Sequence, residues 1–302
     1  MIWDVSPSET PFLSAIPKVK AKAINHEWQT DSLSAAGANA QLEGNDAVAL
    51  DRDSTTRLGN YSQILTKNLA VTGTQEAIDK AGRKSEMAYQ LAKAMKEIKK
   101  DIEWAMLTGA ASAGGVGNAK VSTNLTTARE MASIQTYLTS NYSVGAATGA
   151  VATGDGTDAM TAGTLRDFAE SQLTSVLSSC FTNGGDPKLL FMDATNKGVA
   201  SGFTGGGTHY VDKDNKKLVN SVDVYIGDFH TLKIIPSRQI AGEIVLAIDP
   251  EYVACAELRP VSAKDLSVTG DSIKKQVVSE CTLEVRNEAA HGIIADTNGT
   301  AS

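Results

Sequence analysis

The sequence predicts an α+β fold with several parts that project from its core. Two helical patterns, one over residues 75–107 and one beginning near residue 164, precede a run of short apolar strand patterns, and helices followed by strands are typical of this class. Three prolines punctuate the first 17 residues, and each keeps its predecessor extended. With 302 residues, the chain has room for one large domain or two smaller ones.

Composition and charge exclude several classes of protein. The net charge of −7 disfavours a dedicated nucleic-acid binder, and the cluster Lys93, Lys96, Lys99 and Lys100 is interspersed with acidic residues, as on a solvated helix face. Three scattered cysteines and only four histidines suggest no metal cluster and a reducing compartment at synthesis. Because no apolar run approaches the ~18 residues of a membrane span and no signal peptide is evident, we expect a soluble protein made in the cytosol.

The first element after the proline-rich arm is a strand near residue 28. Residues 26–29, HEWQ, resemble the start of the zinc-protease signature H-E-x-x-H, but Thr30 stands where the second His is required. The residues alternate with a period of two, which places His26 and Trp28 on one face of the strand and Glu27 on the other. The pattern favours a packing role for His26 and Trp28 over a zinc site.

Residues 46–73 predict a projecting hairpin. Two extended runs flank a charged tip that contains Arg52, Asp53 and Arg57. A long two-stranded hairpin is barely stable by itself in water. We therefore expect it to need a partner surface, such as that of another chain.

The clearest element is a helix over about 75–107. Its apolar residues recur at steps of three and four and share one face of a helical wheel, while Lys93, Lys96 and Glu103 lie well off that face. At 1.5 Å per residue such a helix is ~50 Å long, which predicts an elongated or plate-like molecule.

The rest of the chain is predicted as loops, a second strong helix and strands. Residues 109–162 read as a loop-rich region with one modest helix from 127 to 140. Thr164 is a candidate N-cap of the second helix, whose apolar stripe includes Cys180 as a buried small hydrophobe and which ends at Asn183. Short strands follow, and the C-terminus reads as strand, turn and strand.

No motif for catalysis or for a cofactor is complete. Gly82-Arg83-Lys84-Ser85 echoes the end of a P-loop without its first glycine, and Lys217 replaces the glycine that a calcium loop beginning at Asp212 requires. Residues 202–207 contain a glycine cluster that is best interpreted as a flexible surface loop. We therefore expect no enzyme activity, no cofactor and no metal. The projecting parts instead suit a chain that wraps copies of itself.

Several motifs resemble those of the major capsid proteins of tailed bacteriophages. They are Ser6-Pro7-Ser8-Glu9-Thr10-Pro11-Phe12, the segment H-E-W-Q-T-D at 26–31, R-x-x-N-x-x-Q-I at 57–64, V-x-G-T-Q at 71–75 and T-L-E-V-R-N-E-x-A-H-G at 282–292. The resemblance spans most of the chain and is weakest over 109–162.

The resemblance implies the Hong Kong 97 capsid fold. It places an N-terminal arm at 1–45, an extended loop at 46–74, a peripheral domain with a long spine helix at 75–162 and an axial domain at 163–250. C-terminal strands at 251–302 return to the peripheral domain. The implied protein forms hexamers and pentamers of an icosahedral head around double-stranded DNA, which it contacts without sequence specificity. It is made in the bacterial cytoplasm and meets portal, scaffold or decoration proteins.

The resemblance also suggests which residues contact other subunits, and two alternative functions are kept beside it. Subunit contacts are expected from His26, Trp28, Arg52, Asp53, Arg57 and Tyr61, and Gly205, Gly206 and Gly207 are expected at the capsomer centre. An encapsulin-like shell around enzymatic cargo is the first alternative, and a cargo-binding groove would distinguish it. A metal-dependent hydrolase is the second, disfavoured by the missing His.

Overall fold

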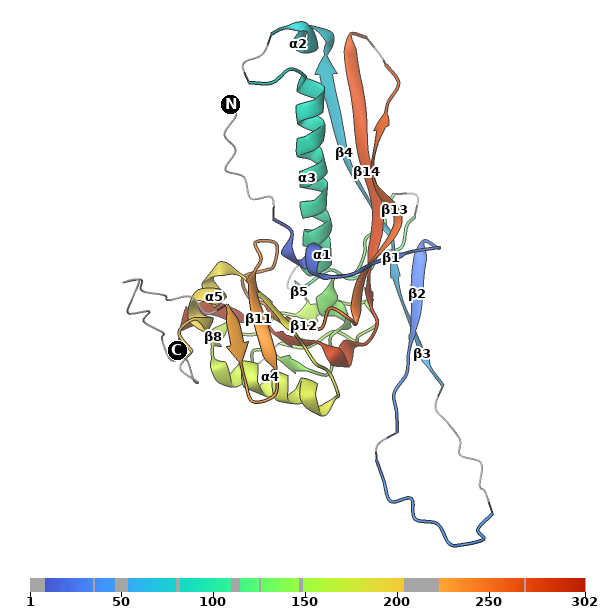
Figure 1. Cartoon of the computed structure of the whole chain (residues 1–302), viewed down its shortest axis with the longest axis vertical. Coiled ribbons are helices and arrows are strands. Elements are labelled where there is room, and N and C mark those ends of the chain that lie inside the picture. The colour runs from blue at the N-terminus through green and yellow to red at the C-terminus, as the bar shows by residue number, and fades with distance from the viewer. Residues whose placement is uncertain are drawn as a thin grey trace, which may run out of the picture.

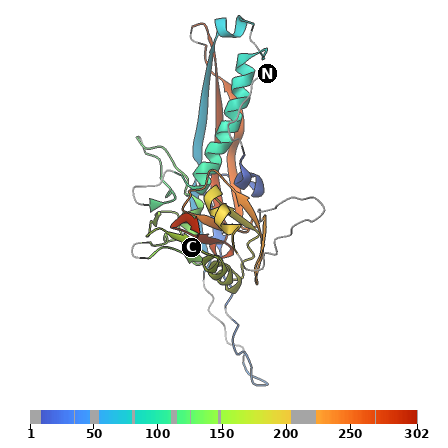
Figure 2. The same cartoon turned by 90° about the vertical axis from the view of Figure 1, so that its left-hand side faces the viewer.

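The computed structural model describes residues 9–34, 36–46, 54–79, 82–109, 115–124, 126–146, 149–203, 223–268 and 270–301. The molecule is elongated, with a tall part built around one long helix and a lower, more compact part (Figures 1 and 2). A ribbon of two strands leaves the junction of these parts and points away from the long helix. Within the described residues, no helix is both long and apolar enough to cross a membrane.

The tall part is a four-stranded sheet with a helix on its face. The sheet order is β1 (Lys18–Lys20), β13 (Val253–Asp265), β14 (Ser272–Val285) and β4 (Gln63–Thr72), with β1 parallel to β13 and the other neighbours antiparallel. Helix α3 (Glu86–Leu107) runs along β4 and β14 (Figure 1). Its buried Ala94, Ile98 and Ile102 share one apolar core with Leu65 of β4 and Val277 of β14. We call this sheet the long-helix sheet.

The lower part is a six-stranded sheet covered by helices. Its order is β10 (Val224–Ile226), β11 (Thr231–Pro236), β9 (Leu189–Met192), β12 (Val245–Ile248), β15 (Gly292–Ile294) and β6 (Tyr142–Ser143). The apolar stripe of α4 (Glu170–Thr182) packs on it, and Cys180 is fully buried there, as predicted. The other elements are α1 (Pro11–Ala15), α2 (Gly73–Ala77), α5 (Ala194–Ala200), β5 (Gly115–Val116), β7 (Met160–Thr161), β8 (Arg166–Phe168), β16 (Thr297–Ala301) and the 3-10 helices η1 (Ile134–Tyr137) and η2 (Glu288–Ala290).

The helix predicted over 75–107 is two helices. The short α2 ends at Ala77 and α3 begins at Glu86, so the long helix has 22 residues and spans about 33 Å. Gly82 lies between them with φ +88, a conformation that ends helical geometry. The Ser85 side chain then caps α3 by accepting from the Ala88 N–H, and Glu76 of α2 accepts from the Glu86 N–H.

Two further helix predictions were wrong. Only η1 forms within 127–140, because the backbone of Ala132 is hydrogen-bonded to the Asn60 side chain instead of to a helical neighbour. Thr164 caps no helix, since Arg166–Phe168 pair in parallel with β16 and α4 begins only at Glu170. In both places a partner distant in sequence overrides the local pattern. The end of α4 at Thr182, followed by Asn183, agrees with the prediction.

The projecting ribbon differs from the predicted hairpin. Strand β3 (Thr56–Tyr61) pairs with β2 (Asn25–Thr30) in antiparallel register, with Trp28 opposite Leu58 and Gln29 opposite Arg57. The ribbon therefore joins the expected arm to the expected extended loop. Residues 47–53, which would form the other half of the hairpin, lie outside the described residues.

The C-terminal segment divides between both sheets. Strands β13 and β14 belong to the long-helix sheet. Strand β15 pairs with β12 in the six-stranded sheet. Strand β6, from the segment expected in the peripheral domain, also joins the six-stranded sheet through its pairing with β15.

Candidate functional site

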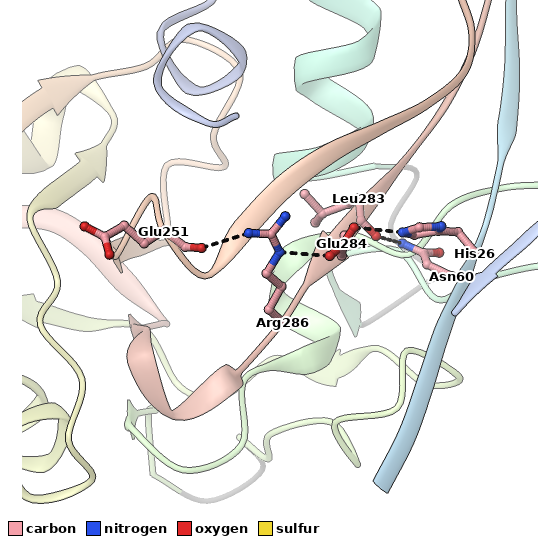
Figure 3. Close-up of polar contacts among 6 residues, drawn as sticks. All are labelled: His26, Asn60, Glu251, Leu283, Glu284 and Arg286. Atoms are coloured by element: carbon pink, nitrogen blue, oxygen red, sulfur yellow. Dashed lines mark hydrogen bonds and ion pairs between the residues drawn. The ribbon is translucent and has the colours of Figure 1, made fainter. Parts of the chain in front are cut away.

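The motif segments converge where the ribbon leaves the body of the protein. Strand β2 contributes His26, β3 contributes Asn60, and β14 contributes Leu283 and Glu284 (Figure 3). We call this group of contacts the ribbon anchor. Its two contacts join residues 258 and 223 positions apart in the chain, so the anchor exists only in the folded protein.

A buried carboxylate holds β2 against the body. His26 Nε2 lies 2.8 Å from Oε2 of Glu284, and Arg286 Nε donates to the other carboxylate oxygen at 2.9 Å. Arg286 also donates to the Glu251 carbonyl oxygen at 3.2 Å (Figure 3). Burial by itself would raise the pKa of Glu284, but the hydrogen bonds from His26 and Arg286 lower it below its ordinary value. The carboxylate therefore stays charged and links the ribbon to β14.

A buried amide holds β3 in the same way. The Asn60 side chain is fully buried and donates to the carbonyl oxygens of Leu283, at 2.9 Å, and Ala132, at 3.2 Å. Its own oxygen accepts from the Ala132 N–H at 2.9 Å. Both amide donors and the amide oxygen thus have partners on two different segments, which fixes β3 between them.

Aromatic packing supports the same face of the ribbon. Trp28 packs on Tyr137, with 5.8 Å between ring centroids, and His26 lies 6.0 Å from Trp28. The Tyr137 hydroxyl donates to the Gly59 carbonyl oxygen, which also accepts from Lys120 Nζ at 2.8 Å. Burial raises the pKa of Tyr137 well above its ordinary value, so the hydroxyl stays a donor.

A second buried carboxylate fixes the junction between β3 and β4. Glu280 accepts from Arg129 Nη2 at 2.5 Å, from Arg259 Nε at 2.7 Å and from the Ser62 hydroxyl at 3.1 Å. Arg129 Nε also donates to the Ser62 carbonyl oxygen at 3.1 Å. A buried carboxylate with two arginine partners is fully compensated, and breaking such a group is strongly destabilising.

Beyond the anchor, the ribbon has little core of its own. Arg57 and Glu27 form an ion pair on its outer face, where the Arg57 side chain is 67% exposed. Tyr61, opposite Asn25, is half-buried. The ribbon is therefore packed on the body along one face and exposed on the face that carries Glu27, Gln29 and Arg57, which allows it to contact another molecule.

The structure separates the predicted contact residues into two groups. His26 and Trp28 lie together in the anchor on one face of β2, as the alternation predicted, while Arg57 pairs with Glu27 on the other face. Arg52, Asp53 and the glycines at 205–207 lie outside the described residues. His26 faces a carboxylate and no second His. Nowhere in the described part of the chain do three potential metal ligands meet.

Sequence reasoning missed the residues that do the anchoring. Glu280 and Glu284 read as exposed positions of an alternating strand, but both are buried. Asn60 and Glu284 belong to the motifs at 57–64 and 282–292, and this could have marked them as important residues. Glu280 belongs to neither motif, and the alternating pattern of β14 does not distinguish it from an exposed residue.

Comparison with known proteins gives one consistent result. The model of the family described as SU10 major capsid protein matches residues 1–298. The major capsid protein of Escherichia phage Phieco32 is 26% identical over 325 residues, covering 98% of this chain and 92% of that protein.

Solved structures agree in fold. The capsid of a native GTA particle matches with a TM-score of 0.60 and 11% identity, over 98% of this chain and 93% of the other. The major capsid protein structure of phage G, solved with its decoration proteins, matches with a TM-score of 0.55 and 10% identity, over 97% and 91% of the two chains. These matches confirm the predicted α+β capsid fold.

Proposed function

Because the chain belongs to the SU10 major capsid protein family, we propose that it is the repeating subunit of an icosahedral phage head. Copies of the chain assemble as hexamers and pentamers, and the finished shell encloses double-stranded DNA. The family match over residues 1–298 is the observation that carries this proposal. The protein is thus a component of the virion, made in the cytoplasm of the bacterial host.

The ribbon supports an assembly role on physical grounds. Ordering an extended ribbon costs conformational entropy, and a ribbon with one exposed face recovers only part of that cost within its own chain. In a shell, repeated head-to-tail contacts between copies bury such surfaces, and closed symmetry leaves none of them unpaired. The anchor sets the direction in which the ribbon reaches a neighbour.

The contact residues follow from this arrangement. We assign Arg57 and Tyr61 to contacts along the ribbon, and His26 and Trp28 to its root, where they fix its orientation for the neighbouring subunit. Arg52 and Asp53 are assigned to ion pairs at the tip of the extended loop. Gly205, Gly206 and Gly207 are assigned to the centre of the capsomer.

Other partners are inferred from the same role. DNA would be contacted without sequence specificity, in keeping with the net charge of −7. A portal protein, and scaffold or decoration proteins, would complete the head. The similar structure of the phage G major capsid proteins also contains decoration proteins. The family is one of structural capsid proteins, and the ribbon anchor supports a mechanical role.

The test is to express and purify the full chain and examine it by light scattering and electron microscopy. Shells tens of nanometres across, or separate hexamers and pentamers, are the expected result. The DNA or protein content of the shells separates a phage head from a cargo compartment. A stable monomer that fails to assemble even with phage scaffold present would contradict the proposal.

A further inference from the structure

A buried carboxylate joins the N-terminal arm to the long helix. Glu103 lies on α3 with none of its surface exposed, although its place on the helical wheel predicted an exposed side chain. Its Oε2 accepts from the Leu13 N–H of α1 at 3.1 Å, and its Oε1 accepts from the Ser237 hydroxyl at 3.2 Å. One side chain thus connects the arm, the long helix and the segment that follows β11.

No cation compensates this carboxylate in the described part of the chain. Helix α1, Pro-Phe-Leu-Ser-Ala, carries no titratable side chain. On α3 the charged residues nearest in sequence are Asp101, which pairs with Lys67, and Lys100 and Lys99, one helical turn earlier than Glu103. Arg238 lies next to Ser237, and none of these residues forms an ion pair with Glu103. Glu103 is therefore held by neutral donors alone.

The burial of Glu103 outweighs its hydrogen bonds. Burial raises the pKa, while the N–H groups of Leu13 and Phe12 and the Ser237 hydroxyl lower it, and the result is a pKa of about 7. The protonated carboxyl fits the same contacts, because it still accepts from Leu13 and its O–H can donate to Ser237. Only the ionised form carries an uncompensated charge.

The arm depends on this contact and on apolar packing. Helix α1 has five residues, too few to be stable without a tertiary contact. Phe12 is fully buried and meets Phe191 of β9 edge to face, with ring centroids 5.5 Å apart. The Leu13 N–H belongs to the first turn of α1, where it has no partner within the helix. Glu103 supplies that partner.

We propose that Glu103 is a proton-linked latch for the N-terminal arm: α1 docks tightly on α3 while the carboxyl is protonated and loosens when it ionises. A cavity of about 620 Å³ is lined by Pro11 of α1 and by Ser237, whose hydroxyl donates to Glu103. The cavity also contains Glu9, Asp193, Lys197 and Arg238. The latch is a property of the folded chain and does not depend on the proposed role in a shell.

The latch predicts the direction in which docking of α1 changes with pH. A carboxyl whose pKa rises on docking stabilises the docked arm fully below its ordinary pKa of 4.5, and loses that contribution as the pH rises through about 7. Amide hydrogen exchange of residues 12–16, corrected for the intrinsic exchange rate and referred to the core amides of β13 and β14, measures docking directly. Between about pH 5.5 and about pH 8.5, the protection of α1 should fall on the order of 10-fold.

Variants of the full chain distinguish titration of Glu103 from a general effect of pH on the stability of the fold. Glu103→Gln mimics the protonated carboxyl, so its α1 protection should be independent of pH and equal to that of the wild type at low pH. Glu97→Gln, on the same helix but with a side chain 40% exposed, should behave as the wild type. Ser237→Ala removes a donor that favours the charged form and should deepen the loss at high pH. Flat protection in the wild type, or a Glu103→Gln profile that follows the wild type, would overturn the proposal.

Discussion

Glu284 Oε2 lies 2.8 Å from His26 Nε2, although 258 positions separate the two residues in the chain. The contact joins the ribbon to the central strand pair of the long-helix sheet, and Arg286 holds the same carboxylate from its other side. The contact therefore holds the start of β2 against β14.

The His26–Glu284 contact should stabilise the folded chain measurably. A double-mutant cycle of His26→Ala and Glu284→Ala, followed by urea unfolding of the purified chain, should give a coupling of about 1 kcal/mol, because the contact is largely buried. The exposed pair Lys188 and Glu251 is the control, and its coupling should be clearly smaller because solvent screens the two charges. Equal coupling free energies in the two cycles would show that the His26–Glu284 contact does not stabilise the folded chain more than an exposed ion pair does.

Acid should release the ribbon. The pKa of Glu284 lies below its ordinary 4.5, so its contribution to stability is present above pH 4.5 and is lost as the pH falls through the folded-state pKa. Hydrogen exchange of the β2 amides should increase in that range in the wild type. Glu284→Gln should show faster exchange already at neutral pH and little further change in acid.

Replacing Asn60 should be among the most destabilising changes near the ribbon. Asn60→Ala leaves the buried carbonyl oxygens of Leu283 and Ala132 and the Ala132 N–H without their partner, and the expected cost is about 3 kcal/mol. The exposed Asn68 on β4 provides a matched control, and Asn68→Ala should change the free energy of unfolding by about 0.5 kcal/mol or less. Similar urea midpoints for both variants would contradict the buried role.

Trp28→Ala should lower the yield of shells. The half-buried indole supports the ribbon against Tyr137, and its loss should cost about 2 kcal/mol and leave the ribbon poorly directed. Sedimentation and electron microscopy measure the yield. Trp104→Ala, at a position 42% exposed on α3, is the control and should assemble normally. Normal shells from Trp28→Ala would count against the assignment of this residue to assembly.

His291 should lower the stability of the fold in mild acid, at pH values above those at which most carboxylates are protonated. Burial lowers the pKa of His291 to about 4, so its contribution to stability is complete above pH 6.5 and is lost as the pH falls toward 4. Glu103 acts with the opposite sign in part of this range, so urea midpoints should be compared in the Glu103→Gln background.

In the Glu103→Gln background, His291→Asn should reduce the fall of the urea midpoint between pH 6.5 and pH 4, because asparagine does not titrate in this range. The asparagine oxygen can still accept from the Asp249 N–H, as His291 Nδ1 does at 3.2 Å. An unchanged slope would show that another group titrates.

Residue patterns predicted the fold class and the strongly periodic elements. Periodicity located α3, the apolar stripe of α4 and the alternating strands, because burial of one face leaves its period in the residue pattern. The alternation at residues 25–30 also placed His26 and Trp28 on one face, as found. Shared motifs indicated the family, and the family match confirmed it.

How these elements meet depends on contacts between segments that are distant in the chain. Strand β2 pairs with β3, β8 pairs with β16, and β15 joins the six-stranded sheet, and each pairing depends on register between distant segments that no local period records. Glu103, Glu280 and Glu284 occupy positions that a helical wheel or a strand pattern assigns to solvent, yet all three are buried. The physical reason is that local patterns measure average polarity, whereas a charged group is buried where specific donors from other segments converge on it.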